Sequence, residues 1–327
     1  MSKGRIVVTG GAGFIGANVV SALNERGEEK ILIVDHLSEG LKWKNLVGLK
    51  FEDYLDRDDF LRLIEEEKLG NIRAIIHLGA CSDTTVKNLQ YLYKNNYQYS
   101  QKICLFALKN NLRFIYASSA ATYGDGSFGF KDDEGLLFKL RPLNPYGFFK
   151  HLFDLWAYQK GFLKFVVGLK YFNVFGDKEF HKGEMRSVAL KAYEQIKREG
   201  KVRLFKSYHP DYEDGGQLRD FIYVKDAVEV TLFFLDHPEI NGLFNVGTGK
   251  ARSFKDLVTA VFHALGLKPN IEYIEMPEPL RKQYQYFTQA DLTKLRKAGY
   301  NKPFRELEEA VKEYVNFLER ESSYFLG

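Results

Sequence analysis

The chain has 327 residues, of which 45% are apolar and 28% are charged, and its net charge is +4. This length is enough for one large α/β unit and a smaller second domain. The small charge, without basic runs that contain aromatic residues, argues against nucleic-acid binding. No stretch approaches the ~18 apolar residues of a membrane span, and no signal-peptide core precedes the first strand, so we expect a cytoplasmic protein without a membrane partner. Cys81 and Cys104 lack metal-ligand spacing, so we expect neither a metal site nor a disulfide framework.

The first predicted element is a short buried strand over residues 5–9, which runs into a glycine-rich segment over 10–16. In a dinucleotide-binding turn, the first glycine allows the bend, the second admits a pyrophosphate, and the third lets the next helix pack closely. Gly10, Gly13 and Gly16 have this spacing. The following helix would direct its N-terminus at the anion.

The second predicted strand, residues 31–34, ends in Asp35, about 20 residues after the end of this turn, where a ribose-binding acid belongs. A carboxylate there accepts a hydrogen bond from a free 2′-hydroxyl and repels a 2′-phosphate, which favours NAD. Cations that could instead neutralise a 2′-phosphate follow at His36, Lys42, Lys44 and Arg57. Residue chemistry alone therefore leaves NAD and NADP equally open.

Strand and helix patterns then alternate, with strands predicted at 74–78, 113–117 and 165–171 and one long helix at 91–110. This order predicts a doubly wound parallel sheet of the Rossmann type, and ligands of such sheets bind beyond the carboxyl ends of the strands. Four loops should lie at that edge, at residues 10–16, 79–82, 118–124 and 173–184. His77 lies inside a strand, where we expect a hydrogen-bonded core histidine.

Tyr146 and Lys150 are four residues apart, which places them on one face of a helix. A nearby ammonium stabilises a phenolate, so we expect Lys150 to lower the pKa of Tyr146 and make it a base for an alcohol. Ser118 and Ser119 end the preceding strand, so a hydroxyl could bond the same substrate oxygen. These residues indicate carbinol oxidation or reduction.

After residue 176 the pattern is less regular, with short strands at 221–224 and 243–246 among helices such as 253–265 and 305–318. We expect a dinucleotide-binding domain over residues 1–175 and a smaller α/β substrate-binding lobe over 176–327, with some segments crossing between them. Arg219 and Tyr284 suit a diphosphate and a sugar or base.

Together these segments resemble the extended short-chain dehydrogenases/reductases that act on nucleotide sugars. The resemblance is carried by TGGAGFIG (9–16), the Ser119, Tyr146 and Lys150 set, RDFIYVKDA (219–227) and FNVGTG (244–249). Longer strings are similar to the ADP-glyceromanno-heptose 6-epimerase group of this family: GACSDTT (79–85), NNYQYS (95–100), ASSAATYG (117–124), RPLNPYGFFK (141–150), HKG (181–183) and YFTQADLTKLRKAGYNKPF (286–304).

This resemblance implies interconversion of ADP-D-glycero-β-D-manno-heptose and ADP-L-glycero-β-D-manno-heptose. The C6″ alcohol would be oxidised transiently to a ketone, and the hydride would return to the opposite face, supplying heptose for the lipopolysaccharide core. The family generally uses NADP, which tips the cofactor prediction that way, and it implies a homo-oligomer, a pentamer.

The resemblance also assigns roles to residues. Tyr146 is implied as one catalytic base and Lys182 as the second, with Ser119 as hydrogen-bonding partner and Lys150 holding the nicotinamide ribose. The implied cofactor contacts are Gly10, Gly13, Phe14, Ile15, Gly16, Asp35, His36, Lys42, Arg57, Leu78, Gly79, Ala80, Cys81, Ser82, Asn95, Lys150, Val174 and Lys182. The implied substrate contacts are Asn173, Glu184, Lys191, Phe205, Lys206, Ser207, Tyr208, Arg219 and Tyr284.

Two segments depart from the family pattern. Residues 177–180, DKEF, replace a segment that commonly bears proline and arginine, and the loop over 207–217 is longer than in some members.

Three other functions are compatible with parts of the sequence. A nucleotide-sugar dehydratase needs an acid pair where this chain has Ala120 and Ala121. A UDP-hexose 4-epimerase keeps the same Ser, Tyr and Lys and is the main alternative. A non-catalytic dinucleotide-sensing regulator does not need the base that Tyr146 and Lys150 form.

Overall fold

The computed structural model describes residues 4–37, 39–281 and 284–326. Its larger sheet has seven strands, all parallel to their neighbours, as the alternating pattern predicted. In spatial order they are β10 (Gly242–Val246), β6 (Val166–Tyr171), β5 (Arg113–Ser119), β4 (Ile72–His77), β1 (Arg5–Thr9), β2 (Ile31–Asp35) and β3 (Asp53–Asp56). The winding direction reverses between β1 and β4, which is where ligands of doubly wound sheets bind.

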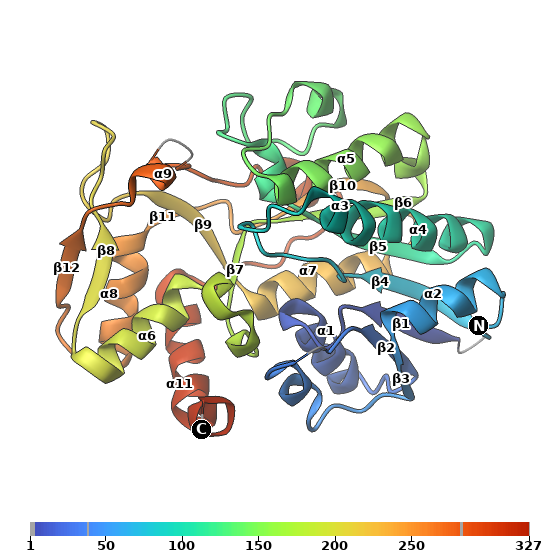
Figure 1. The fold of residues 1–327 in the computed structure, drawn as a ribbon, viewed down its shortest axis with the longest axis horizontal. Helices are drawn as coiled ribbons and strands as arrows, with labels where there is room; N and C mark the ends of the chain where they lie inside the picture. Colours follow the sequence, from blue (N-terminus) through green and yellow to red (C-terminus); the bar gives the residue numbers. More distant parts are fainter. Residues whose placement is uncertain (1–3, 38, 282–283, 327) are drawn as a thin grey trace.

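Helices cover both faces of this sheet (Figure 1). Apart from the edge strand β3, the strands are mostly apolar, because successive side chains point to opposite faces and both faces are buried. Val7 packs into the cluster with α2 (Arg57–Glu65), α4 (Tyr99–Lys109) and α5 (Pro145–Gln159), whereas Ile6 and Val8 pack into the cluster with α1 (Phe14–Glu25) and α7 (Val224–Asp236).

The helix predicted over 91–110 is not one regular α-helix. It comprises α3 (Leu89–Leu92), a π-helical segment η2 (Tyr93–Gln98) and α4. In η2, Arg57 Nη1 donates to Asn95 Oδ1 at 2.6 Å, and Asn96 exchanges hydrogen bonds with the Cys81 backbone at 2.8 Å. The prediction of one regular α-helix was therefore wrong near its start, where hydrogen bonds to Arg57 and Cys81 accompany the wider π-helical winding.

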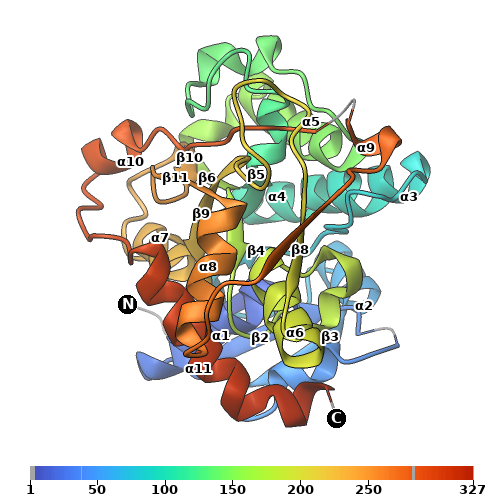
Figure 2. The same ribbon diagram turned by 90° about the vertical axis from the view of Figure 1, so that its left-hand side faces the viewer.

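The smaller lobe lies on the left in Figure 1 and faces the viewer in Figure 2. It contains the sheet β11 (Ala251–Ser253), β9 (Leu218–Tyr223) and β7 (Asn173–Phe175), and a parallel pair, β8 (Val202–Phe205) with β12 (Ile271–Ile274), which the sequence pattern did not predict. Helices α6 (Val188–Glu199), α8 (Phe254–Ala264) and α11 (Leu307–Leu326) pack together beside them. The remaining helical segments are η1 (Lys42–Leu46), η3 (Ala120–Tyr123), η4 (Glu134–Lys139), η5 (Phe162–Lys164), η6 (Phe180–Met185), α9 (Glu278–Arg281) and α10 (Thr293–Lys297).

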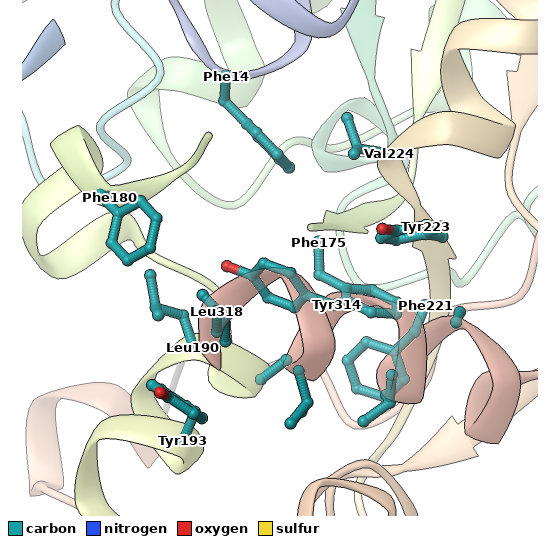
Figure 3. Packing of buried hydrophobic residues seen from close by; sticks show 14 of the residues in the cluster. Phe14, Phe175, Phe180, Leu190, Tyr193, Phe221, Tyr223, Val224, Tyr314 and Leu318 are labelled. Carbon is teal, nitrogen blue, oxygen red and sulfur yellow. The ribbon is translucent and has the colours of Figure 1, made fainter. Parts of the chain in front are cut away.

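The two parts share one hydrophobic core. Figure 3 shows Phe14 of α1, Phe175 of β7, Tyr223 of β9 and Tyr314 of α11 in the same cluster. Strand β10 follows residue 176 in the chain yet completes the larger sheet by pairing with β6. Segments thus cross between the parts. Among the helices of the described residues, none is long and apolar enough to cross a membrane.

Candidate active site

A cavity of about 710 Å³ opens at the carboxyl ends of β1, β4, β5 and β6. It brings together predicted catalytic side chains that lie far apart in the sequence, Tyr146 and Lys182. The predicted residues that line it are Gly10, Gly13, Phe14, Ile15, Gly16, Asp35, Lys42, Leu78, Gly79, Ala80, Cys81, Ser82, Ser119, Tyr146, Lys150, Val174 and Lys182.

The glycine-rich turn is shaped as the spacing predicted. Gly10 has φ +68°, a region that favours glycine, and a Cβ there would lie 2.7 Å from the Gly79 nitrogen. A Cβ on Gly16 would lie 2.1 Å from the Gly10 carbonyl oxygen. The turn therefore accepts no side chain at either position, and it leaves backbone facing the cavity beside the N-terminus of α1, where an anion is favoured.

At the end of β2, the Asp35 carboxylate is buried and already holds three donors. Oδ2 accepts from Ala12 N at 2.9 Å, Oδ1 accepts from His36 N at 2.7 Å, and the Lys42 ammonium forms an ion pair with Oδ1. This pairing neutralises the charge that would repel a 2′-phosphate.

The other predicted residues near this end lie beside the cavity rather than on its lining. His36 is paired with Asp56 at 3.2 Å, and Arg57 donates to Asn95. Asp35 and Lys42 therefore line the cavity, whereas Arg57 and Asn95 do not and are bonded to each other.

Helix α5 carries Tyr146 and Lys150. Asn144 caps it by accepting from Gly147 N at 2.8 Å, and Pro145 occupies its first turn. A Cβ on Gly147 would lie 2.7 Å from the Ala121 carbonyl oxygen, so this glycine lets the helix approach the turn after Ser119.

The expected effect of Lys150 on Tyr146 is not observed. Burial raises the pKa of Tyr146, while a hydrogen bond with Ser119 opposes that rise. Burial also lowers the pKa of Lys150 to about 8, opposed by Asp154, and the ammonium donates to the Ala117 carbonyl oxygen at 2.7 Å. Burial removes both groups from water, which disfavours their charged forms. Ser119, which we expected to bond a substrate oxygen, lies within hydrogen-bonding reach of the phenol.

Sequence reasoning missed a buried polar cluster under α5. The Asp154 carboxylate accepts from Tyr116 OH at 2.9 Å, Ser118 Oγ at 2.7 Å and Lys170 Nζ at 2.7 Å, and both members of the Asp154–Lys170 pair are almost fully buried. The cluster links helix α5 to β5 and β6. The signal was present, because Asp154 continues the four-residue spacing of Tyr146 and Lys150.

His77 is a hydrogen-bonded core histidine, as predicted. Its Nδ1 lies 2.6 Å from Thr9 Oγ1 and its Nε2 lies 2.9 Å from Ser100 Oγ. Burial, with a smaller contribution from Lys150, lowers its pKa to about 3, so the ring is neutral and serves the fold.

Lys182 lies in η6 and lines the same cavity as Tyr146. Its Nζ is 4.9 Å from the centroid of the Phe14 ring and 4.0 Å from Glu179 Oε2. Burial lowers the pKa of Lys182, and Glu179 opposes this while Lys191 adds to it. An amine of lowered pKa beside a cavity can exchange a proton with a substrate.

The predicted substrate residues lie toward the smaller lobe, outside the lining of this cavity. The Arg219 guanidinium lies between the rings of Phe254 and Tyr284, at 5.5 and 5.4 Å, and Arg281 stacks on Tyr208 at 3.8 Å. Two other predicted substrate residues lie on strands, Asn173 in β7 and Phe205 at the end of β8. Two predicted lysines form ion pairs, Lys191 with Glu184 at 3.2 Å and Lys206 with Glu275 at 2.8 Å. The backbone N of Ser207 donates to Asp214 at 2.7 Å.

The loop over 207–217 adds aromatic residues to this region. Rings of His209, Tyr212 and Tyr286 lie 5.1–5.3 Å apart. Among the residues that the structure describes, no group of three or more His, Cys, Asp or Glu side chains could hold a metal ion.

Residues 6–247 match the family described as NAD dependent epimerase/dehydratase. An ADP-L-glycero-D-manno-heptose-6-epimerase of Nitratidesulfovibrio vulgaris (strain DP4) is 56% identical over 310 residues, which cover 94% of this chain and 96% of the relative. One from Fusobacterium nucleatum subsp. nucleatum is 48% identical, covering 98% and 99%. The crystal structure of the Helicobacter pylori enzyme of the same name has a TM-score of 0.79 at 28% identity, covering 97% of this chain and 96% of that one.

Proposed function

This chain belongs to the NAD dependent epimerase/dehydratase family, and from this premise we propose that it is an ADP-glyceromanno-heptose 6-epimerase. It interconverts ADP-D-glycero-β-D-manno-heptose and ADP-L-glycero-β-D-manno-heptose. The similarity to relatives of that name extends over nearly the whole chain, at 56% and 48% identity, and it disfavours a UDP-hexose 4-epimerase.

The observation that supports the mechanism is that two side chains able to exchange a proton, Tyr146 of α5 and Lys182 of η6, line one cavity. Oxidation at C6″ gives a planar ketone, and inversion requires the hydride to return to the other face. If the C5″–C6″ end turns, the carbonyl oxygen points to a new place, so a second proton partner is needed there.

In this scheme each side chain has one task. Tyr146 exchanges a proton with the oxygen in one orientation, and Lys182 does so in the other. Ser119 hydrogen-bonds the oxygen beside Tyr146, and Lys150 holds the ribose of the cofactor. Arg219 faces the diphosphate, with Tyr284 beside the sugar or base.

For the cofactor we propose NADP. The glycine-rich turn, in which a Cβ at Gly10 or Gly16 would clash with backbone atoms, supports a dinucleotide, and the Lys42–Asp35 pair supports a 2′-phosphate. When bound, the nicotinamide would accept a hydride from C6″ and return it. Gly10 to Gly16 would hold the pyrophosphate, while Lys42, with Arg57 and His36 behind it, would face the 2′-phosphate.

We further propose that residues 1–175 mainly hold the cofactor and 176–327 mainly hold the substrate, with β10 and Lys182 as crossing elements. The protein would act as a homo-oligomer, a pentamer, in the cytoplasm and supply heptose for the lipopolysaccharide core.

The test is to incubate the purified protein with ADP-D-glycero-D-manno-heptose and follow the C6″ configuration by NMR. We expect a mixture of both C6″ epimers without added reductant. Turnover of UDP-glucose to UDP-galactose, with the heptose left unchanged, would overturn the proposal in favour of a UDP-hexose 4-epimerase.

A further inference from the structure

The loop between β7 and η6 contains a carboxylate with no solvent exposure, that of Glu179. Its Oε1 accepts from Ser187 Oγ at 2.6 Å, Tyr314 OH at 3.0 Å and Gly176 N at 3.2 Å, and its Oε2 accepts from Ser187 N at 2.6 Å. One side chain therefore joins the end of β7, the start of α6 and the C-terminal helix.

Each of these donors comes from a well-anchored position. Ser187 is the N-cap of α6, because its Oγ also accepts from Leu190 N at 3.2 Å. The Tyr314 ring packs beside Phe175 in the core, and Figure 3 shows its hydroxyl directed toward the side where Phe180 lies. The carboxylate position is thus determined from three elements at once.

All four donors are neutral, so they satisfy the oxygen lone pairs without cancelling the charge. A buried charge without a counter-ion is costly. Among the ion pairs of the described residues, the cation that faces Glu179 is Lys182, with Nζ 4.0 Å from Oε2. The backbone repeats the link, since Lys182 N donates to the Glu179 carbonyl oxygen at 3.1 Å.

The other charged groups around this pair are engaged elsewhere. Asp177 accepts from Tyr223 OH at 2.9 Å and lies 3.6 Å from Lys225. Lys191, a like charge to Lys182, is paired with Glu184 at 3.2 Å. His181 is the chain neighbour of Lys182, and the charges of Lys42 and Lys182 both help to lower its pKa. The face of the Phe14 ring also lies beside Lys182.

We propose that Glu179 is a positioning residue for the reaction, which fixes Lys182 at the cavity and keeps its ammonium form available. Glu179 does not line the cavity, so it acts through Lys182. The proposal rests on the proposed role of Lys182 as second base. In this proposal the segment over residues 177–180, which departs from the family pattern, supplies a buried carboxylate beside Lys182.

The expected direction of the change in the pKa of Lys182 is the same whichever direction of the reaction uses this lysine as the base. Burial lowers the pKa of Lys182 and Glu179 opposes this, so removing the carboxylate should lower that pKa further. An opposite charge within about 4–6 Å changes a pKa by about 1–3 units, and Lys182 keeps some exposure, so we expect about one pH unit.

The test compares Glu179→Gln with two matched variants. Asp177→Asn removes a buried charge from the same loop, and Tyr314→Phe removes a neutral donor but keeps the Glu179 charge. Lysines are reductively methylated with ¹³C-formaldehyde and titrated by NMR, and the Lys182 signal is the one missing from Lys182→Met. We expect a lower pKa in Glu179→Gln alone. An unchanged pKa there, or an equal fall in Tyr314→Phe, would overturn the proposal.

Activity provides the second readout. In Glu179→Gln, the limb of the kcat pH profile that depends on Lys182 should move to lower pH by the same amount, with KM little changed. If Glu179→Gln does not fold, Glu179→Asp, which withdraws the charge by one methylene group, should show a smaller fall in the same pKa. If Lys182→Met epimerises normally, the proposed two-base function fails. If Lys182→Met is inactive while the pKa of Lys182 in Glu179→Gln equals that of the wild type, only the role of Glu179 fails.

Discussion

The Lys150 ammonium donates a hydrogen bond to the Ala117 carbonyl oxygen at 2.7 Å. This bond ties helix α5 to β5 one residue before the strand reaches Ser118, and so it fixes Tyr146, one turn earlier on the helix, near Ser119. The geometry of the phenol therefore depends on backbone packing as well as on helical spacing.

Tyr146→Phe should reduce turnover of ADP-D-glycero-D-manno-heptose about 10²- to 10⁴-fold, because it removes the proton-exchanging hydroxyl. Bound nucleotide and the thermal unfolding midpoint should stay near wild-type values. Tyr158→Phe, at an exposed tyrosine on the same helix, is the control and should keep full activity. Retention of more than about a tenth of the activity by Tyr146→Phe would move the base elsewhere.

Lys182→Met should nearly stop epimerisation while leaving the Kd for the substrate close to that of the wild type. The reason is that one ketone orientation loses its proton partner but the binding contacts remain. Lys178→Met is the matched control in the same loop, where Nζ donates to the Asn45 carbonyl oxygen at 3.0 Å. Loss of activity through lost substrate binding in Lys182→Met would contradict a two-base mechanism.

NADP should be released from the denatured wild-type protein, with no net NADPH accumulating during turnover. Lys42→Met should lower NADP affinity about 10- to 100-fold relative to NAD, because Asp35 loses its counter-ion and repels the 2′-phosphate. Lys44→Met is the control, since Lys44 donates to the Tyr324 carbonyl oxygen at 2.6 Å. Finding NAD alone in the wild type would mean that Asp35 outweighs Lys42 and Arg57.

Asp154→Asn should destabilise the fold by about 3–5 kcal/mol, because it leaves Lys170 buried without its partner. Urea unfolding measures this change. The control is Glu65→Gln, which breaks an exposed pair with Lys102 at 2.9 Å and should cost only about 0–1 kcal/mol. Equal costs for the two variants would show that burial of the Asp154–Lys170 pair does not matter.

The stability of the protein should fall below pH ~6.5 partly through His77. Its pKa is lowered from 6.5 to about 3 in the fold, so the unfolded chain takes up the proton first, and stability is lost as pH falls through this window. His77→Gln should remove about 1 kcal/mol of the difference between urea unfolding at pH 7 and pH 5.5. His263→Gln, at an exposed histidine on α8, should leave that difference unchanged.

Much of the cofactor half of the site followed from local sequence. Turn chemistry, strand length and the position of Asp35 are short-range properties, and the parallel order of strands brings their carboxyl ends to one edge. For that reason the glycines, the loop after β4 and the Tyr146–Lys150 face were predicted together and line one cavity.

Only the tertiary structure decided the electrostatics of the site and its supporting contacts. Whether Lys150 acidifies Tyr146 depends on burial, which is set by elements distant in the chain, and here burial prevails. The partners of Asp154 and Glu179 lie up to 38 and 135 residues away, distances over which no periodicity links residue types. Sequence thus determined which groups reach the strand ends, whereas packing determined their charge and their partners, because desolvation and hydrogen bonding depend on every element that surrounds a buried group.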